Sequence, residues 1–209
     1  GFRVTEVSKL TGFPEMMDGR LKTLHPNVHG GLLADRDEKS HVNAMEKYNV
    51  KEIDLLVVNL YPFAETVRAG ADYAQCIENI DIGGPAMIRA AAKNFKYVAT
   101  LVDIEDYEGL VNELKMNNGC TSYSFRQKLS QNAFSLSAYY DAMISNWMLD
   151  NITGVKPRRF SISAALSQDL RYGENPHQNA SFFLDEYLQG GIGASNQIQG
   201  KKLSYNNIN

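Results

Sequence analysis

The sequence predicts an α/β fold with a mostly parallel sheet flanked by helices. Two apolar runs of strand length, residues 53–60 and 97–102, have the near-continuous hydrophobicity of parallel strands covered on both faces. A helix of about a dozen residues is expected around 65–78, and an alanine-rich helix follows it. Strand and helix therefore alternate from residue 53 to 117, which indicates a parallel sheet with helical crossovers.

The beginning of the chain combines an extended start with a turn-rich segment. Residues 4–7 resemble a strand, and glycines and prolines punctuate residues 12–31. An extended loop within that segment would direct Arg20, Lys22 and Thr23 the same way, which suits a phosphate or a polar heterocycle. An exposed polar loop without a ligand is the alternative, and composition alone favours it.

A zinc site is not expected at His25 and His29, although their spacing is that of a helical zinc pair. Pro26 lies between them and prevents His25 from lying inside a helix that continues through it. No carboxylate or cysteine nearby completes a set of ligands, so we expect no metal.

Polar side chains follow the first predicted strand at its end. Pro62 stops the strand, and ligands in doubly wound folds gather outside the carboxyl ends of the strands. Asn59 and Tyr61 therefore lie where chemistry is expected. For Tyr61, an aromatic plug over the core is the alternative.

The stretch 79–94 places a carboxylate and two glycines before the alanine-rich helix. Pro85 suits the first helical position, because its missing N–H would have no intrahelical partner there. Gly83 and Gly84 would leave bare N–H groups at the helix N-terminus, which is a natural anion site. Lys93 lies one turn after an arginine, so two basic residues share a face. A solvated basic face after a tight turn is the alternative.

Three further helices are expected. Residues 37–48 predict a charged surface helix, and Asp103 is suited to cap another helix that ends near Gly119. The apolar stripe of that second helix is Ile104, Tyr107, Leu110, Val111 and Leu114. Residues 121–148, capped by Thr121, predict one long helix that packs on its own domain or on a partner subunit. Its narrow apolar seam consists of Leu129, Ala133, Leu136, Tyr140, Met143 and Trp147.

A change in composition after the long helix predicts the domain organisation. Residues 1–150 form the first domain, residues 151–159 a linker, and residues 160–209 the start of a second region that is too short to bury its own core. In that region, 160–165 and 181–184 have the pattern of strands. The chain lacks an initiator Met and stops without closing an element, so we expect a segment of a longer protein.

Composition excludes several classes of protein. The net charge of −3 argues against nucleic-acid binding, which requires a basic excess or a basic patch. No apolar run approaches the ~20 residues of a membrane helix, and the N-terminus has no secretory signal. Cys76 and Cys120 fit no metal pattern and are interpreted as reduced packing residues. We expect a soluble cytoplasmic protein without nucleic-acid or membrane partners.

Seven motifs in register resemble one family. They are Thr11 to Met16, Gly19 to Pro26, Asn59 to Phe63, Ile80 to Gly84, Ala90 to Asn94, Leu170 to Gln178 and Gln199 to Asn207. Together they resemble the bifunctional purine-biosynthesis family that joins an IMP cyclohydrolase to an AICAR transformylase. The resemblance implies a methylglyoxal-synthase-like α/β domain, followed by the opening of a second α/β, cytidine-deaminase-like transformylase domain.

The resemblance also implies an activity and a set of site residues. The substrate would be formyl-AICAR and the products IMP and water, with no metal or cofactor in that step. The implied catalytic residues are Lys22, Tyr61, Asp81 and Lys93. The implied nucleotide-binding residues are Arg20, Thr23, Asn59, Gly83 and Gly84, and those that would contact AICAR in the second domain are Arg171, Tyr172 and Asn207. The transformylase would take 10-formyltetrahydrofolate as co-substrate, and the protein would be a homodimer.

Two expectations limit what this segment does by itself. The family's first strand–helix unit, which holds the 5′-phosphate, would precede residue 1, and the transformylase's Lys-His pair would lie beyond residue 209. Two other classes compete with the enzyme. One is a non-catalytic effector-binding module of the same fold, and the other is an oligomerisation domain, which would explain the seam of the long helix but not the polar loops.

Overall fold

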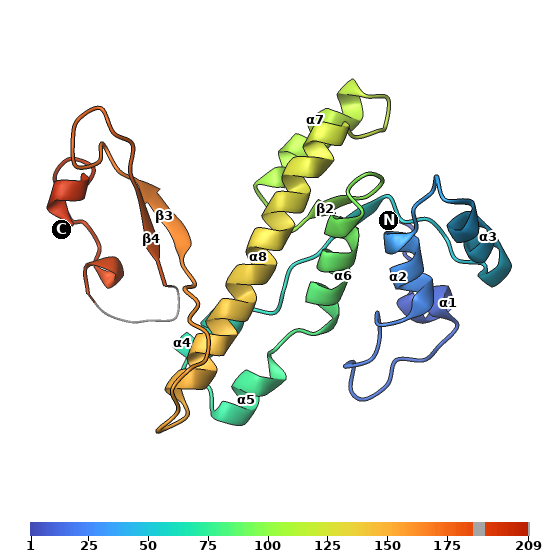
Figure 1. The fold of residues 1–209 in the computed structure, drawn as a ribbon, viewed down its shortest axis with the longest axis horizontal. Helices are drawn as coiled ribbons and strands as arrows, with labels where there is room; N and C mark the ends of the chain where they lie inside the picture. Colours follow the sequence, from blue (N-terminus) through green and yellow to red (C-terminus); the bar gives the residue numbers. More distant parts are fainter. Residues whose placement is uncertain (186–190, 209) are drawn as a thin grey trace. The chain divides into compact units, whose positions relative to one another are not determined.

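The computed structural model describes residues 1–185 and 191–208, which form two compact units. Unit 1 comprises residues 1–61 and 81–138, and unit 2 comprises residues 62–80 and 139–209. Figure 1 labels the helices and strands of both units. Among the described residues, no helix has the length and apolar character needed to cross a bilayer.

A parallel pair of strands lies at the centre of unit 1. β1 (Leu55–Val57) pairs with β2 (Ala99–Leu101), and Leu55 lies opposite Ala99 in the register. The predicted parallel pairing is therefore confirmed, although both strands are shorter than the apolar runs that predict them. β2 is buried along its length, as expected.

β1 is not covered on both faces, contrary to the prediction. Leu55 and Val57 are 40% and 45% exposed. They share a face with Ala99 and Leu101, but the side chains that cover this face pack over β2 alone; these are Leu110, Phe125 and Leu129. The apolar pattern of β1 therefore predicted a strand correctly, but it did not predict whether another layer covers that strand.

Helix α6 (Gly83–Lys93) packs on the other face of the strand pair. Its Ala90 and Ala91 lie against Val28 and Leu32 of α2 (Pro26–Leu33), and Val98 completes this cluster. Alanines permit close approach of the two helices because they carry a single methyl group. Ile88 and Ala92 of α6 form a second cluster with Val102 and Ala133.

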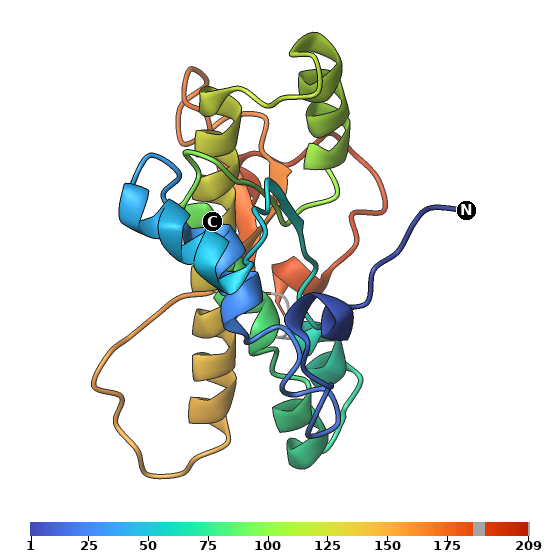
Figure 2. The same cartoon turned by 90° about the vertical axis from the view of Figure 1, so that its right-hand side faces the viewer.

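The N-terminal segment differs from its prediction. Residues 4–7 form no strand: residues 1–6 are exposed and extend from the unit (Figure 2), and helix α1 begins at Val7 (Val7–Thr11). The prediction of a turn-rich segment over residues 12–31 holds only up to residue 25. The two glycines at 30 and 31 lie inside helix α2. His25 is the N-cap of α2, and its Nδ1 accepts a hydrogen bond from the N–H of Asn27, so Pro26 begins the helix as its chemistry favours.

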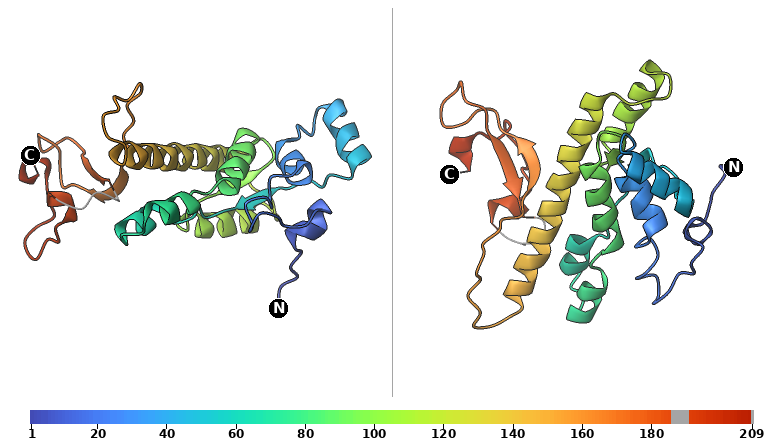
Figure 3. Two further views of the ribbon diagram at one scale, coloured as in Figure 1. Left: turned by 90° about the horizontal axis from the view of Figure 1, so that it is seen from below. Right: turned by 45° about the vertical axis from the view of Figure 1, so that its right-hand side comes forward.

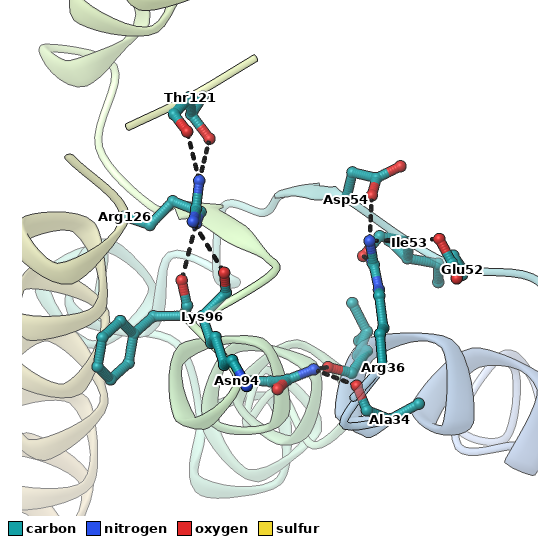
Figure 4. Close-up of polar contacts among 11 residues, drawn as sticks. Ala34, Arg36, Glu52, Ile53, Asp54, Asn94, Lys96, Thr121 and Arg126 are labelled. Atoms are coloured by element: carbon teal, nitrogen blue, oxygen red, sulfur yellow. Dashed lines mark hydrogen bonds and ion pairs between the residues drawn. The ribbon is translucent and has the colours of Figure 1, made fainter. Parts of the chain in front are cut away.

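Polar side chains hold the loops of unit 1 (Figure 4). The guanidinium of Arg126 donates to the carbonyls of Phe95 and Lys96 at 2.8 Å each and also bonds Thr121. The amide of Asn94 donates to the carbonyls of Leu32 and Ala34 at 2.8 and 2.9 Å. These bonds satisfy carbonyls at the end of α2, in the segment that follows α6 and in the segment before α8.

Two of the predicted surface helices are found, with different boundaries. α3 (Lys39–Tyr48) buries no residue, as predicted. α7 (Asp106–Met116) begins after Asp103, whose side chain does not cap it, and no residue of α7 is buried. Its apolar stripe is largely exposed, with Ile104 at 67% and Val111 at 46%, because α7 contacts the core mainly through Leu110.

Helix α8 (Tyr123–Asp150) is the single long helix that the sequence predicts, and it contributes to both units. Ser122, rather than Thr121, caps it, because the Ser122 hydroxyl accepts from the N–H of Phe125. Burial of the seam is confirmed. In unit 1 its buried members are Leu129 and Ala133, and in unit 2 they are Tyr140, Met143 and Trp147.

The helix predicted around 65–78 is divided in two. α4 (Phe63–Arg68) and α5 (Tyr73–Glu78) are separated at Gly70, whose φ is +74°. Asp72 and Gln75 then form a capping box, in which each side chain bonds the other residue's backbone N–H.

Cys76 on α5 is buried as predicted, whereas Cys120 is exposed and does not pack.

The remainder of unit 2 contains an antiparallel pair, β3 (Ala165–Asp169) and β4 (Ser181–Leu184), whose strands lie side by side in Figure 3. The strand at 181–184 is confirmed. The strand predicted at 160–165 is wrong. The first strand of the pair begins only at Ala165, the first residue that pairs with β4. Residues 151–159, the predicted linker, have no helix or strand. Two short 3-10 turns follow, η1 (Ile192–Ala194) and η2 (Tyr205–Asn207).

Candidate functional site

Three polar loops of unit 1 meet at the N-terminus of α6. A Cβ atom on Gly83 would lie 2.7 Å from Oγ1 of Thr23, and one on Gly84 would lie 2.8 Å from Cδ2 of Leu60. The segments 20–23, 59–61 and 81–84 therefore approach one another at distances that only glycine permits. Because residues 59–61 follow the carboxyl end of β1, this is the place in an α/β sheet where ligands bind.

Asp81 closes the first turn of α6. Its Oδ1 accepts a hydrogen bond of 2.8 Å from the N–H of Gly84. The helix begins at Gly83, so Pro85 occupies its third position and not its first. The predicted bare N–H at Gly84 is therefore wrong, since a carboxylate of the chain itself occupies it and also complements the positive end of the helix.

Lys22 is held by an acidic neighbour. Its Nζ lies 2.9 Å from Oε2 of Glu15, and both side chains are about half exposed. The hydrogen bond to Glu15 and the charge of that carboxylate raise the pKa of Lys22, and Tyr61 raises it further through its charge. Lys22 and Tyr61 are thus near enough to interact electrostatically.

Tyr61 is 56% exposed, so it does not plug the core, and the alternative interpretation of this residue is wrong. Asn59 is also exposed. Arg20 lies one residue before the strand-like bridge between Met16 and Leu21, in the same hairpin that carries Lys22. The structure therefore gathers the segment of Arg20, Lys22 and Thr23 and the segment of Asn59 and Tyr61 around the Gly83–Gly84 turn, through Thr23 and Leu60.

Lys93 is not part of this gathering. It is the last residue of α6 and is exposed, whereas Asp81 precedes the first. The 11 residues of the helix span about 15 Å. Arg89, one turn earlier, points toward α8, where its guanidinium lies 3.5 Å from Oγ of Ser137 and 5.7 Å from the ring centre of Phe134. A role for Lys93 stays a prediction.

The predicted residues of unit 2 form a second cluster. The N–H of Arg171 donates to the carbonyl of Leu203 at 2.9 Å, and the N–H of Tyr205 donates to the carbonyl of Tyr172 at 3.2 Å. The guanidinium of Arg171 also lies 5.3 Å from the ring centre of Tyr172. These backbone bonds join the end of β3 to the segment that carries η2.

Asn207 belongs to the same segment. Its Oδ1 accepts hydrogen bonds from the N–H and the hydroxyl of Ser204 at 3.0 and 2.9 Å, and Ser204 is almost fully buried. The amide is therefore oriented by the protein. The structure brings Arg171, Tyr172 and the segment of Asn207 together, as the motifs predict.

Sequence reasoning missed Glu15 as a partner of a site residue. The Asp18-Gly19 pair was a signal for a turn in this segment, but it did not specify the register that places residues 15 and 22 opposite each other. In the described part of the chain, no three His, Cys, Asp or Glu side chains are grouped to hold a metal. Burial lowers the pKa of His29, which favours its neutral form.

Comparisons with known proteins agree on one family. A family model described as the AICARFT/IMPCHase bienzyme matches residues 91–209, and a model described as an MGS-like domain matches residues 1–86. The curated proteins named bifunctional purine biosynthesis protein PurH from Dinoroseobacter shibae and Ruegeria pomeroyi are 61% and 58% identical to the whole chain. The protein of that name from Rhizobium johnstonii is 54% identical.

The match does not extend over the whole of those relatives. The chain spans about two fifths of their length, 40% in Dinoroseobacter shibae and 39% in Rhizobium johnstonii. Among solved structures, the one titled crystal structure of ForH is 35% identical, with a TM-score of 0.61 over 71% of this chain and 77% of that chain. With a bienzyme model that matches more than half of its residues, the chain belongs to the AICARFT/IMPCHase bienzyme family.

Proposed function

We propose that unit 1 carries an IMP cyclohydrolase site, which closes formyl-AICAR to IMP with loss of water. The observation that carries this proposal is the close approach of the segments 20–23, 59–61 and 81–84 around the two glycines. That approach concentrates cationic, hydroxyl and carboxylate groups at the end of a parallel strand. The names of the relatives, which describe a bifunctional purine biosynthesis protein, support the same reaction.

The reaction explains the types of residue involved. The carboxamide nitrogen attacks the formyl carbon of the same molecule, so holding the two groups in the reactive rotamer contributes much of the rate. The attacking nitrogen loses a proton, and the formyl oxygen becomes an alkoxide that is protonated and later leaves as water. Donors and a positive charge near the formyl oxygen are therefore required.

We assign the roles as follows. Lys22 supplies positive charge and Tyr61 a donor hydroxyl to the formyl oxygen, and Asp81 orients the carboxamide and formyl groups. Lys93 is assigned to the same step as a proposed source of charge and protons, although it lies at the other end of α6 from Asp81 in this structure. Support for Lys22 comes from its ion pair with Glu15, which holds the amine on the hairpin that leads to Thr23. The remaining contacts to the nucleotide are assigned to Arg20, Thr23, Asn59, Gly83 and Gly84.

Unit 2 is assigned the start of an AICAR transformylase that uses 10-formyltetrahydrofolate. Arg171, Tyr172 and Asn207 would contact the AICAR nucleotide. Support comes from the contacts that join the end of β3 to residues 203–207, and from the ordered amide of Asn207. A cytoplasmic homodimer completes the proposal.

The test uses a bienzyme of full family length that contains this segment. Formyl-AICAR is added, and IMP formation is followed by absorbance in the wild type and in the variants Lys22→Ala, Tyr61→Phe, Asp81→Asn and Lys93→Ala. Lys47→Ala, on the surface helix α3, is the matched control. The site assignment fails if all four variants stay within about tenfold of the wild-type rate, or about 1.4 kcal/mol. Tight binding of IMP without any turnover in the wild type would favour the effector-binding module instead.

A further inference from the structure

The hairpin of residues 15–22 is built around an acidic residue. Met16 and Leu21 form an antiparallel bridge, so the next pair outward, Glu15 and Lys22, lies directly opposite across the hairpin. The ion pair of 2.9 Å between them is a cross-strand pair of opposite charge. It closes the hairpin at its open end.

The carboxylate of Glu15 has a second contact inside the hairpin. Its Oε2 faces Lys22, while its Oε1 lies 2.9 Å from where a Cβ on Gly19 would be. Gly19 also has a φ of +90°, which side chains disfavour. The turn thus leaves room for the carboxylate, which lies between the turn and the amine.

The turn itself is conformationally constrained. Met17 and Asp18 have φ values of +55° and +52°, and the N–H of Gly19 donates to the carbonyl of Met16 at 3.2 Å. This is the geometry of a hairpin turn whose two central residues are both left-handed. Left-handed backbone at Met17 is unfavourable for that residue type, and such strain collects in segments that serve a site.

From this geometry we propose that Glu15 is a positioning residue, which holds the Lys22 amine at one end of the 15–22 hairpin for contact with the substrate. The proposal rests on the proposed function of Lys22 and adds a residue that no motif assigns. Glu15 does not touch the substrate in this proposal. It acts through Lys22, by fixing the position of the charged amine.

A double-mutant cycle in the full-length bienzyme tests the proposal. Glu15→Gln keeps the shape of the side chain and removes its charge. We expect kcat for ring closure to fall about tenfold, with a smaller change in KM, because misplacement of a reacting group is costly. In a Lys22→Ala background, measured in single turnovers at high enzyme concentration, the same change should alter the rate by less than about twofold.

Asp18→Asn is the matched control. It removes one negative charge from the same hairpin, and asparagine tolerates the left-handed backbone at this position. It should leave kcat within about twofold. A loss from Glu15→Gln that is no larger than the loss from Asp18→Asn, or that is unchanged in the Lys22→Ala background, would overturn the proposal.

A second measurement separates this proposal from the proposed function. The pKa of the Lys22 amine, followed by NMR of the lysine side chain, should be lower in Glu15→Gln than in the wild type. If the wild type does not close the ring but the pKa of the Lys22 amine falls in Glu15→Gln, the proposed activity is wrong and the interaction between Glu15 and Lys22 is confirmed. If the wild type is active but the pKa does not move, Glu15 does not hold Lys22.

Discussion

The carboxylate of Asp81 and the backbone of Gly84 are in contact through both carboxylate oxygens. Oδ1 accepts the N–H of Gly84 at 2.8 Å, and Oδ2 lies 2.5 Å from the place that a Cβ on residue 84 would occupy. A side chain at position 84 would therefore displace the carboxylate that caps α6. The orientation of Asp81 depends on the absence of a side chain three residues later.

The first prediction follows from this contact. Gly84→Ala should destabilise the protein by about 1–3 kcal/mol, because the new methyl group meets both Asp81 and Leu60 in a packed turn. Gly109→Ala, inside α7, is the matched control, since its methyl group would lie 3.4 Å from Phe125 in ordinary contact. It should stabilise by up to about 1 kcal/mol. Urea unfolding measures both, and shifts of the same sign would contradict the prediction.

The second prediction concerns strain in the hairpin that carries Lys22. Met17 has a φ of +55° and is 66% exposed, so Met17→Asn removes an unfavourable conformation and little packing. We expect a gain of about 0.5–1 kcal/mol in the free energy of unfolding. Met116→Asn, at an 82% exposed position that ends α7, is the control and should bring no gain. Equal effects of the two substitutions would mean that the turn is unstrained.

Local sequence patterns predicted several features of the fold correctly. The seam of α8 follows from helical spacing alone, and most of its members are buried. The parallel pairing of β1 and β2 follows from two apolar runs separated by a crossover. The position of His25 outside α2 follows from the proline after it. For the seam and for His25 the determining residues lie within a few positions of the feature, and for the strand pair each apolar run is itself a local pattern.

The predictions that failed depend on what lies opposite an element. Residues 4–7 and 160–165 have strand-like composition, but a strand also needs a partner, and the sequence does not say where the partner begins. The stripe of α7 has helical spacing, yet spacing does not reveal whether another element covers it. Gly70 divides a predicted helix because a left-handed residue there allows the Asp72 capping box to form.

In the candidate site too, local patterns predicted some features and missed those that depend on a facing segment. The rule that ligands bind at the carboxyl ends of parallel strands predicts chemistry at the segment of Asn59 and Tyr61, and this segment approaches the Gly83–Gly84 turn through Leu60. The pairing of Lys22 with Glu15 needed the register of a hairpin, and that register depends on backbone angles at Met17 and Asp18. Motif spacing does not specify those angles.

The third prediction concerns the aromatic cluster of unit 2. Phe63 is 1% exposed, and its ring centre lies 5.3 Å from that of Trp147, edge to face. Tyr73 stacks on Trp147 at 5.0 Å. Phe63→Ala should cost about 3–5 kcal/mol, because it leaves a cavity under the cluster. The emission of Trp147, the single tryptophan in the chain, should shift to the red.

Phe160→Ala is the control for that experiment. Phe160 belongs to the same unit but is 83% exposed, so its removal should change the free energy of unfolding by less than about 0.5 kcal/mol. Tryptophan fluorescence during urea unfolding measures both variants. An unshifted emission maximum in Phe63→Ala would show that Trp147 is not packed against this ring.

The last prediction concerns pH. The Lys96 amine lies 2.5 Å from Oδ2 of Asp37, and this hydrogen bond, with a second one from Tyr97, lowers the pKa of Asp37 below its ordinary value of 3.8. A carboxyl group with a lowered pKa in the folded state stabilises that state above pH 3.8. The contribution is lost as the pH falls through the lowered pKa. Asp37 in turn raises the pKa of Lys96, so the pair also weakens as the pH rises above 10.5, the ordinary value of lysine.

Asp37→Asn should therefore lower the urea midpoint at neutral pH, and the difference from the wild type should shrink below pH 3.8 and above pH 10.5. Lys96→Met is the partner variant, because without the amine the pH-dependent effect of the change at Asp37 should be much smaller, with only the Tyr97 hydrogen bond left to lower its pKa. Both side chains are at least half exposed, so 1 M salt should reduce the difference at neutral pH as well. A difference that stays constant with pH, or that is undiminished in Lys96→Met, would show that the two charges do not interact in solution.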